Sequence, residues 1–172
     1  MTISDAKNMI AAATSASEPQ AWIDLGCGAG TFTLALAALL PPGSEVTGVD
    51  KAQQNLPERS ANGNIIKFIK SDIVNLSVEP NVDGVLMANA LHYIRDQEGF
   101  IERLLTIMNR RFRLLLVEYD NDRPNPWVPY PVSFSRLQNL FKSPIFRIEK
   151  LNESASVYGQ GNMYAALITL HH

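Results

Sequence analysis

The sequence has little cysteine and almost no net charge. Cys27 is its single cysteine, so no internal disulfide can form, and such a chain is typical of a reducing compartment. We therefore expect a cytoplasmic protein. The formal net charge is −2, which argues against general electrostatic binding of nucleic acid. The basic cluster at Arg110–Arg113 leads directly into an apolar stretch and fits a solvated corner better than a phosphate contact.

Long apolar runs are also missing. The longest, Leu34 to Leu40, is too short to span a bilayer, and the first residues do not combine a basic start with an apolar core. We expect neither a membrane-embedded nor a secreted protein. The chain has 172 residues, and no repeat or long linker divides them. This length can bury about 70% of the unfolded surface, which predicts one domain over residues 1–172.

Apolar stretches rich in β-branched residues alternate with segments of helical periodicity, which predicts an α/β fold. Helices are expected within residues 1–18, from Phe32 to Leu40, from Asp96 onward and around Phe134 to Phe141, with a short one beginning at Pro57. The predicted strands cover residues 21–26, 45–50, 65–70, 82–89, 113–119, 146–151 and 163–170. No helix separates the last two strands. The pattern predicts an open sheet of seven strands, mostly parallel, with an antiparallel C-terminal hairpin and helices on both faces.

Three glycines stand in five positions directly after the first strand, at Gly26, Gly28 and Gly30. Glycine permits a tight turn and a close approach of a ligand to the main chain. An open parallel sheet binds ligands beyond the carboxyl ends of its strands. Asp50 ends the second strand, about 20 residues beyond the last glycine, where a carboxylate can accept both hydroxyls of a ribose. Together these residues predict a ligand of the adenosine type.

The glycine spacing helps to distinguish two adenosine ligands. A dinucleotide is usually held by G-x-G-x-x-G, with a helix N-terminus aimed at its pyrophosphate. Here the spacing is G-x-G-x-G, and Asp24 precedes it. An acidic residue beside the loop repels a pyrophosphate but suits a ligand that carries an ammonium and a sulfonium. An NAD(P)-dependent oxidoreductase is therefore the weaker alternative.

The segment DLGCGAGTFT, together with GVD at the end of the second strand, resembles the class I S-adenosylmethionine-dependent methyltransferases. The resemblance covers nearly the whole chain and implies a small enzyme with a Rossmann-like sheet and S-adenosylmethionine as its cofactor. It implies methyl transfer to a small-molecule acceptor, with the nucleophile aligned in line with the sulfonium. A non-catalytic protein that binds S-adenosylmethionine or a partner is the alternative from another class.

The resemblance also implies which residues hold the cofactor. Asp50 would bind the ribose, Lys51 would lie beside the adenine, and Asp72 would accept the exocyclic amine, although Asp72 also suits a solvated loop or a helix cap. In chain order, the residues implied in cofactor binding are Asp24, Gly26, Cys27, Gly28, Asp50, Lys51, Asp72, Ile73, Asn89 and Ala90.

The acceptor side is less defined. His92, Tyr93 and Glu118 are the catalytic candidates, because they follow or end the fourth and fifth strands at the ligand edge; a purely structural role is an equal alternative for His92 and Glu118. The proline-rich loop over residues 120–132 holds Trp127, which either walls the acceptor pocket or fills the core under the loop. We expect no metal, because no set of carboxylates with an amide can be assembled around one. The pocket is either shallow or completed by a second subunit, which leaves a homodimer open.

Overall fold

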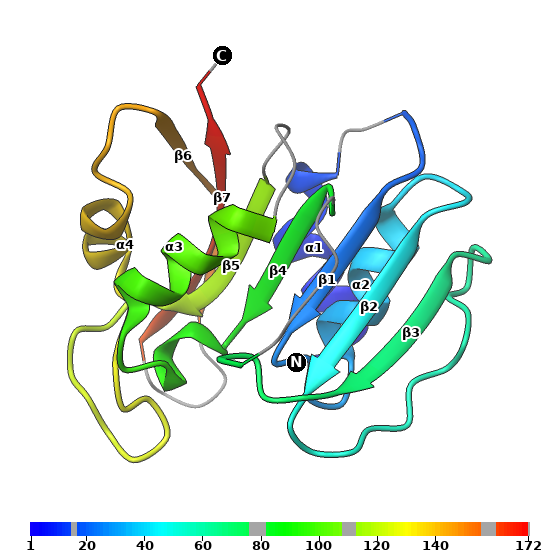
Figure 1. Ribbon diagram of the computed structural model, residues 1–172, viewed down its shortest axis with the longest axis horizontal. Coiled ribbons are helices and arrows are strands. Elements are labelled where there is room, and N and C mark those ends of the chain that lie inside the picture. The colour runs from blue at the N-terminus through cyan, green and yellow to red at the C-terminus, as the bar shows by residue number, and fades with distance from the viewer. Residues whose placement is uncertain (15–16, 76–81, 108–112, 156–160, 172) are drawn as a thin grey trace.

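The computed structural model describes residues 1–14, 17–75, 82–107, 113–155 and 161–171, and it is built on one seven-stranded sheet (Figure 1). The strands lie in the order β3-β2-β1-β4-β5-β7-β6. Their bounds are β1 Ala21–Leu25, β2 Glu45–Asp50, β3 Ile65–Lys70, β4 Gly84–Ala88, β5 Arg113–Tyr119, β6 Phe146–Ala155 and β7 Asn162–Leu170. The predicted strands are all present, and the α/β fold class is confirmed.

The pairing of the strands creates one switch point in the sheet. The strands β3, β2, β1, β4 and β5 are parallel, whereas β7 runs antiparallel between β5 and β6. The chain proceeds outward from β1 to β3 and then returns to place β4 on the other side of β1. Ligands of open α/β sheets bind beyond the carboxyl ends of the strands at such a reversal. The predicted glycine turn lies there, directly after β1.

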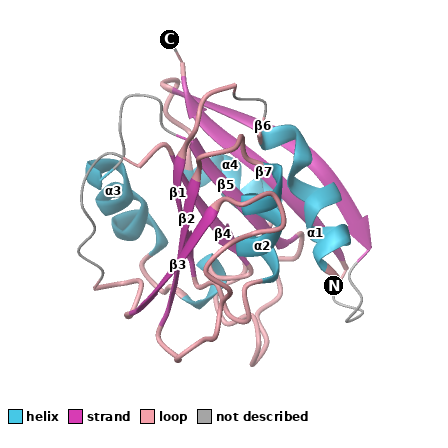
Figure 2. Ribbon diagram, turned by 90° about the vertical axis from the view of Figure 1, so that its right-hand side faces the viewer, coloured by secondary structure: helices cyan, strands magenta, loops and turns pink. Residues whose placement is uncertain are grey.

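Helices cover both faces of the sheet. Helices α1 (Ile3–Ile10) and α2 (Thr31–Leu39) pack on one face, and α3 (Gln97–Ile107) and α4 (Phe134–Leu140) contribute to the core of the other. Figure 2, which views the sheet nearly edge-on, shows α3 on the side opposite α1 and α2. Two short 3-10 turns, η1 (Ala11–Ala13) and η2 (Leu91–Tyr93), follow α1 and β4. Each face buries its own apolar cluster, so the sheet is the middle of three layers.

Packing in the core explains why residue 84 is a glycine. The Trp22 ring, which is 1% exposed, lies against Gly84 at the start of β4. A Cβ atom at Gly84 would come within 2.6 Å of the ring atoms, so only glycine fits beside this indole. The indole Nε1 donates a hydrogen bond to Gln20 Oε1 at 3.0 Å, which satisfies its buried polar atom.

The helix expected at Pro57 is wrong, because residues 51–64 form turns and irregular structure. Leu56 is the only large apolar side chain in this stretch, so a helix would have no apolar face to bury. Proline also disfavours helical geometry in the residue before it. Instead, Leu56 packs against Gly30, and Ile66 N donates to Glu58 O at 2.9 Å. Most of the predicted basic corner, residues 110–112, lies outside the described residues.

Candidate active site

A cleft of about 510 Å³ opens at the carboxyl edge of the sheet, around the switch point between β1 and β4. Its lining brings together most of the residues implied in cofactor binding. The lining residues are Gly26, Asp50, Lys51, Asp72, Ile73, Val74, Asn89, Ala90, Tyr93 and Ile94. The sequence patterns do not predict that Val74 and Ile94 line the cleft. The one sequence feature that points to them is that they directly follow Ile73 and Tyr93. Asp24, Cys27 and Gly28 do not line this cleft.

The turn after β1 requires glycine, which has no side chain, at two positions. Gly26 and Gly28 have φ values of +78° and +49°, in the left-handed region that favours glycine. The amides of Gly26 and Cys27 both donate to Val49 O, at 2.8 and 3.0 Å, and tie the turn to β2. A Cβ atom at Gly26 would lie 2.7 Å from the Cβ of Ala90, whereas nothing lies within 4 Å of the corresponding position at Gly28. The turn therefore packs tightly at Gly26 and borders open space at Gly28.

The carboxylate of Asp50 is held in place by the same turn. Its Oδ2 accepts a hydrogen bond from Gly28 N at 2.9 Å, and its Oδ1 accepts one from Ala52 N at 2.9 Å. Each carboxylate oxygen can accept a further hydrogen bond. Asp50 thus presents an oriented acceptor to the cleft that it lines.

Asp72 caps a turn and also borders the cleft. It lines the cleft, and its Oδ1 accepts a hydrogen bond from Val74 N at 3.0 Å, which caps the turn after β3. The side chain is exposed, and one carboxylate oxygen remains for a ligand. Ile73 and Val74 add apolar surface beside it.

Asp24 lies beneath the turn rather than on the wall of the cleft. It is 1% exposed, and its Oδ2 accepts a hydrogen bond from Thr33 Oγ1 at 2.6 Å. Among the described residues its Oδ1 has no partner. Burial raises the pKa of this carboxyl to about 7; the bond from Thr33 opposes the rise and the nearby charge of Asp50 adds to it. The protein therefore holds a carboxyl here that is partly protonated at neutral pH.

Asn89 is strained and incompletely hydrogen-bonded. Its φ of 54° is the only positive value of a non-glycine residue in the described chain. Its amide donates to Val117 O at 2.8 Å, but its side-chain Oδ1 is buried without a partner there. Backbone strain of this kind is concentrated at functional sites. Asn89 lines the cleft, while its Oδ1 atom is itself buried.

Cys27 is a packing residue in this structure. It is 8% exposed, and its Sγ would lie 3.0 Å from a Cβ built on Gly48 of β2. Burial, with the nearby charges of Asp24 and Asp50, raises the pKa of the thiol to about 12. The thiol stays protonated at neutral pH, so Cys27 is no nucleophile.

His92 and Glu118 form a buried pair beside the cleft. The Nδ1 atom of His92 lies 2.6 Å from Glu118 Oε2, and both side chains are nearly fully buried. A carboxylate accepts hydrogen bonds, so Nδ1 is the donor in this contact. Neither residue lines the cleft, whereas Tyr93, the next residue along η2, does. The imidazole also lies against Tyr93 and Tyr119, with ring centroids 4.4 and 6.0 Å apart.

The proline-rich loop follows β5 and docks on η2. Tyr130 N donates to His92 O at 3.0 Å, and Gln97 Nε2 donates to Tyr130 O at 2.9 Å. Trp127 is 69% exposed, so the alternative that it fills the core is wrong, and Val128, which is 3% exposed, packs there instead. Trp127 is also not among the residues that line the cleft.

Two further expectations concern metals and membranes. Within the described ranges, no group of three or more His, Cys, Asp and Glu side chains is placed to hold a metal ion. No described helix has the length and apolar character needed to cross a membrane.

Residues 17–162 match the family described as "Methyltransferase domain". The match covers most of the chain, which therefore belongs to this family of methyltransferase domains. The predicted class of enzyme, and with it S-adenosylmethionine as the methyl donor, is confirmed at the level of the family. No curated protein sequence matches the chain.

Several solved structures share the fold. The 1,6-didemethyltoxoflavin-N1-methyltransferase of Burkholderia thailandensis, solved with its substrate and S-adenosylhomocysteine, has a TM-score of 0.72 and 17% identity, over 99% of this chain and 78% of that one. The magnesium protoporphyrin IX methyltransferase of Synechocystis, solved with S-adenosylmethionine, has a TM-score of 0.64 and 16% identity, over 96% and 77%. The mitomycin 7-O-methyltransferase MmcR has a TM-score of 0.67 and 19% identity, and the match covers 98% of this chain but only 54% of that one. At these identities the likeness establishes the fold.

Proposed function

We propose that the chain transfers a methyl group from S-adenosylmethionine to a small-molecule acceptor, as one domain over residues 1–172. The observation that carries this is the position of Asp50. Its carboxylate is fixed by two backbone amides at the carboxyl end of β2 and borders the open space beside Gly28. This arrangement suits a ligand whose ribose hydroxyls meet the carboxylate while its chain passes over bare backbone.

The chemistry of the cleft fits S-adenosylmethionine better than a dinucleotide. Asn89 follows β4 and lines the cleft, and Asp24 lies beneath the glycine turn; their side-chain atoms Asn89 Oδ1 and Asp24 Oδ1 are buried and have no partner in the described chain. Spare acceptors favour a cationic donor such as an ammonium and disfavour a pyrophosphate. Asp72 and the apolar Ile73 and Val74 would hold the adenine, and Lys51 would cover its face with its aliphatic stem.

The protein's part in the reaction is alignment. When bound, the cofactor supplies an electrophilic methyl group on a sulfonium. Asp50 would orient the ribose and Asn89 and Ala90 would border the methionine portion, while η2 places Tyr93 at the wall of the same cleft. His92, held by Glu118, acts either by positioning η2 or by accepting a proton from the acceptor through Nε2.

Calorimetry and turnover together test the proposal. The protein should bind S-adenosylmethionine and S-adenosylhomocysteine and bind NAD and NADP much more weakly. Release of S-adenosylhomocysteine that depends on an added acceptor separates an enzyme from a non-catalytic binding protein. Tight binding of a nicotinamide dinucleotide would instead favour the oxidoreductase.

The proposal includes a cytoplasmic location and a homodimer. The single cysteine is a free, buried thiol, which is consistent with a cytoplasmic protein. A homodimer that completes the acceptor pocket is the assembly to test, by measuring molecular mass in solution.

A further inference from the structure

The exposed aromatic side chains gather at one edge of the molecule. Among the described residues they are Tyr93, Trp127 and Tyr130, which are 58%, 69% and 38% exposed. Tyr93 lies in η2 after β4, and the other two lie in the loop after β5. Because β4 and β5 are parallel neighbours, both segments leave the sheet at its carboxyl edge (Figure 1). The cleft opens at the same edge. Exposed aromatic residues grouped beside a cleft indicate a binding surface.

The aromatic edge meets the cleft at Tyr93, whereas Trp127 and Tyr130 are not among the lining residues. The backbone of Tyr130 is hydrogen-bonded to His92 O at 3.0 Å, so Tyr130 stands beside η2. Trp127 belongs to the same turn of the loop, in which Asn125 and Val128 exchange backbone hydrogen bonds at 3.1 Å and Asn125 Oδ1 accepts from Trp127 N at 2.9 Å.

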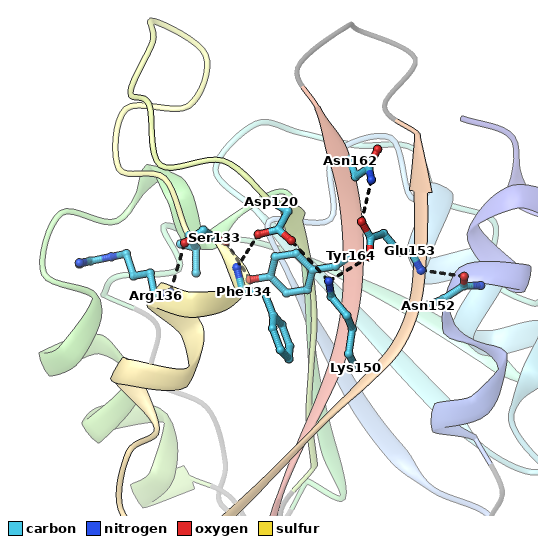
Figure 3. A network of polar contacts seen from close by, with 10 residues as sticks. Asp120, Ser133, Phe134, Arg136, Lys150, Asn152, Glu153, Asn162 and Tyr164 are labelled. Carbon is cyan, nitrogen blue, oxygen red and sulfur yellow. Dashed lines mark hydrogen bonds and ion pairs between the residues drawn. The ribbon is translucent and has the colours of Figure 1, made fainter.

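The loop that carries Trp127 and Tyr130 is fixed at both ends (Figure 3). At its start, Asp120 Oδ1 accepts a hydrogen bond from Phe134 N at 2.8 Å, and Asp120 Oδ2 lies 3.4 Å from Lys150 Nζ. At its end, the buried hydroxyl of Tyr164 donates to Val132 O at 2.8 Å. The aromatic side chains are thus held on an anchored wall, and less conformational entropy is lost when a ligand binds.

The neighbouring part of the cleft carries no charge. The lining residues contributed after β4 are all neutral: Asn89, Ala90, Tyr93 and Ile94. Glu118, the nearest acid of β5, is buried against His92 and is not on the surface. The lining on this side therefore offers an ionic acceptor no opposite charge, and the exposed charges of the same segments, Arg95 and Arg123, lie outside the lining.

We propose that the methyl acceptor is an uncharged, planar aromatic or heteroaromatic molecule whose ring stacks on Tyr93 and Trp127. This inference rests on the proposed function and names the substrate class of the same site. Aromatic pairs prefer offset-stacked or edge-to-face geometry, and tyrosine and tryptophan each add a polar group at the rim. An oxygen or nitrogen lone pair of the acceptor forms the new bond to the methyl carbon. The C–S bonding pair stays on sulfur, and the acceptor's proton leaves to solvent, either directly or by way of His92.

The two tryptophans allow a direct test in the intact protein. Trp22 is 1% exposed and Trp127 is 69% exposed, so the two indole N–H resonances report the core and the aromatic edge separately. The ¹⁵N-labelled protein, saturated with S-adenosylhomocysteine, is titrated with 2-naphthol and with its saturated counterpart 2-decalol. We expect 2-naphthol to shift the Trp127 resonance and to bind about three- to tenfold more tightly than 2-decalol, as stacking predicts. The Trp22 resonance should not move.

Variants of the two aromatic residues test whether they contact the ring of the acceptor. Tyr93→Leu and Trp127→Leu should each weaken 2-naphthol binding about three- to tenfold, whereas Tyr93→Phe, which keeps the ring, should restore it. Ile145→Ala, at another exposed apolar residue (54% exposed) in the connection before β6, is the matched control and should bind as wild type.

The outcomes separate the two proposals. Equal binding of 2-naphthol and 2-decalol, or no binding of either, would overturn the aromatic acceptor while leaving S-adenosylhomocysteine binding intact. Tighter binding of phenyltrimethylammonium than of 2-naphthol would overturn the uncharged acceptor and indicate a cation site. Failure to bind S-adenosylhomocysteine would overturn the proposed function itself.

Discussion

Glu118 holds His92 by two atoms: its Oε2 lies 2.6 Å from the ring Nδ1, and its Oε1 accepts a hydrogen bond from the His92 amide at 3.3 Å. One carboxylate at the end of β5 therefore fixes both the backbone and the ring of η2. The pair couples the two strand ends between which the acceptor would lie.

Replacing His92 tests that coupling. We expect His92→Ala to lower the free energy of unfolding by about 3–5 kcal/mol, because Glu118 is left buried without its partner. The affinity for S-adenosylhomocysteine should change little, since neither residue lines the cleft, and methyl transfer should fall. Urea unfolding, calorimetry and turnover measure the three quantities.

A double-mutant cycle with Glu118→Gln provides the control. Non-additive stabilities would measure the energetic coupling of the pair. Additive stabilities, or an unchanged rate of methyl transfer in His92→Ala, would contradict it. A pH–rate profile that loses its ascending limb in the variant would favour proton acceptance over positioning.

Asp50 should be the main determinant of cofactor affinity. Asp50→Ala removes the acceptor for the ribose hydroxyls and should weaken S-adenosylhomocysteine binding by about 1–3 kcal/mol. Calorimetry measures the change, and circular dichroism checks that the turn at Gly28 survives the loss of its own bond to Asp50. Ala substitution of Glu58, which is exposed and does not line the cleft, is the control. Equal affinities of wild type and Asp50→Ala would remove Asp50 from the site.

Gly28 and Gly63 form a matched pair for testing the turn. Both have positive φ, +49° and +86°, and nothing lies within 4 Å of a Cβ at either position. A non-glycine residue in this region costs about 1–2 kcal/mol. Gly28→Val should abolish S-adenosylhomocysteine binding in a folded protein, because the side chain would enter the open space beside the cleft. Gly63→Val, before β3 at the opposite edge, should carry a similar strain and bind normally. Loss of binding in both variants would mean that strain alone is responsible.

The buried carboxyl of Asp24 should make the stability of the protein depend on pH. Burial raises its folded-state pKa from 3.8 to about 7, so the native state binds more protons than the unfolded state between these values. The stability of the ligand-free protein should therefore decrease as pH rises from about 4 to 7 and level off above, with each pKa unit worth about 1.4 kcal/mol. In Asp24→Asn this decrease should shrink. Thermal unfolding at pH 5 and pH 8 checks it, and an unchanged pH slope in the variant would assign the dependence to other groups.

Local sequence determined the elements and the position of the site. The apolar, β-branched stretches between helical segments predicted the positions of all the strands. The glycines and Asp50 predicted the position of the cleft, because a turn that needs positive φ and an acid at the end of a strand are local requirements. The helix at Pro57 failed for a local reason too: a single leucine gives a helix nothing to bury.

The tertiary structure decided what depends on distant neighbours. No sequence pattern indicates that β7 lies between β5 and β6, because strand order is set by packing across the sheet. Asp24 and Cys27 stand in the motif, yet both side chains are buried, because Asp24 bonds to Thr33 of α2 and Cys27 packs against Gly48 of β2. Trp127 is exposed because Val128 occupies the core position in its loop. The meeting of His92 with Glu118 joins residues 26 positions apart, through the parallel pairing of β4 and β5. Burial and pairing of this kind arise only when the strands assemble, and no local pattern encodes them.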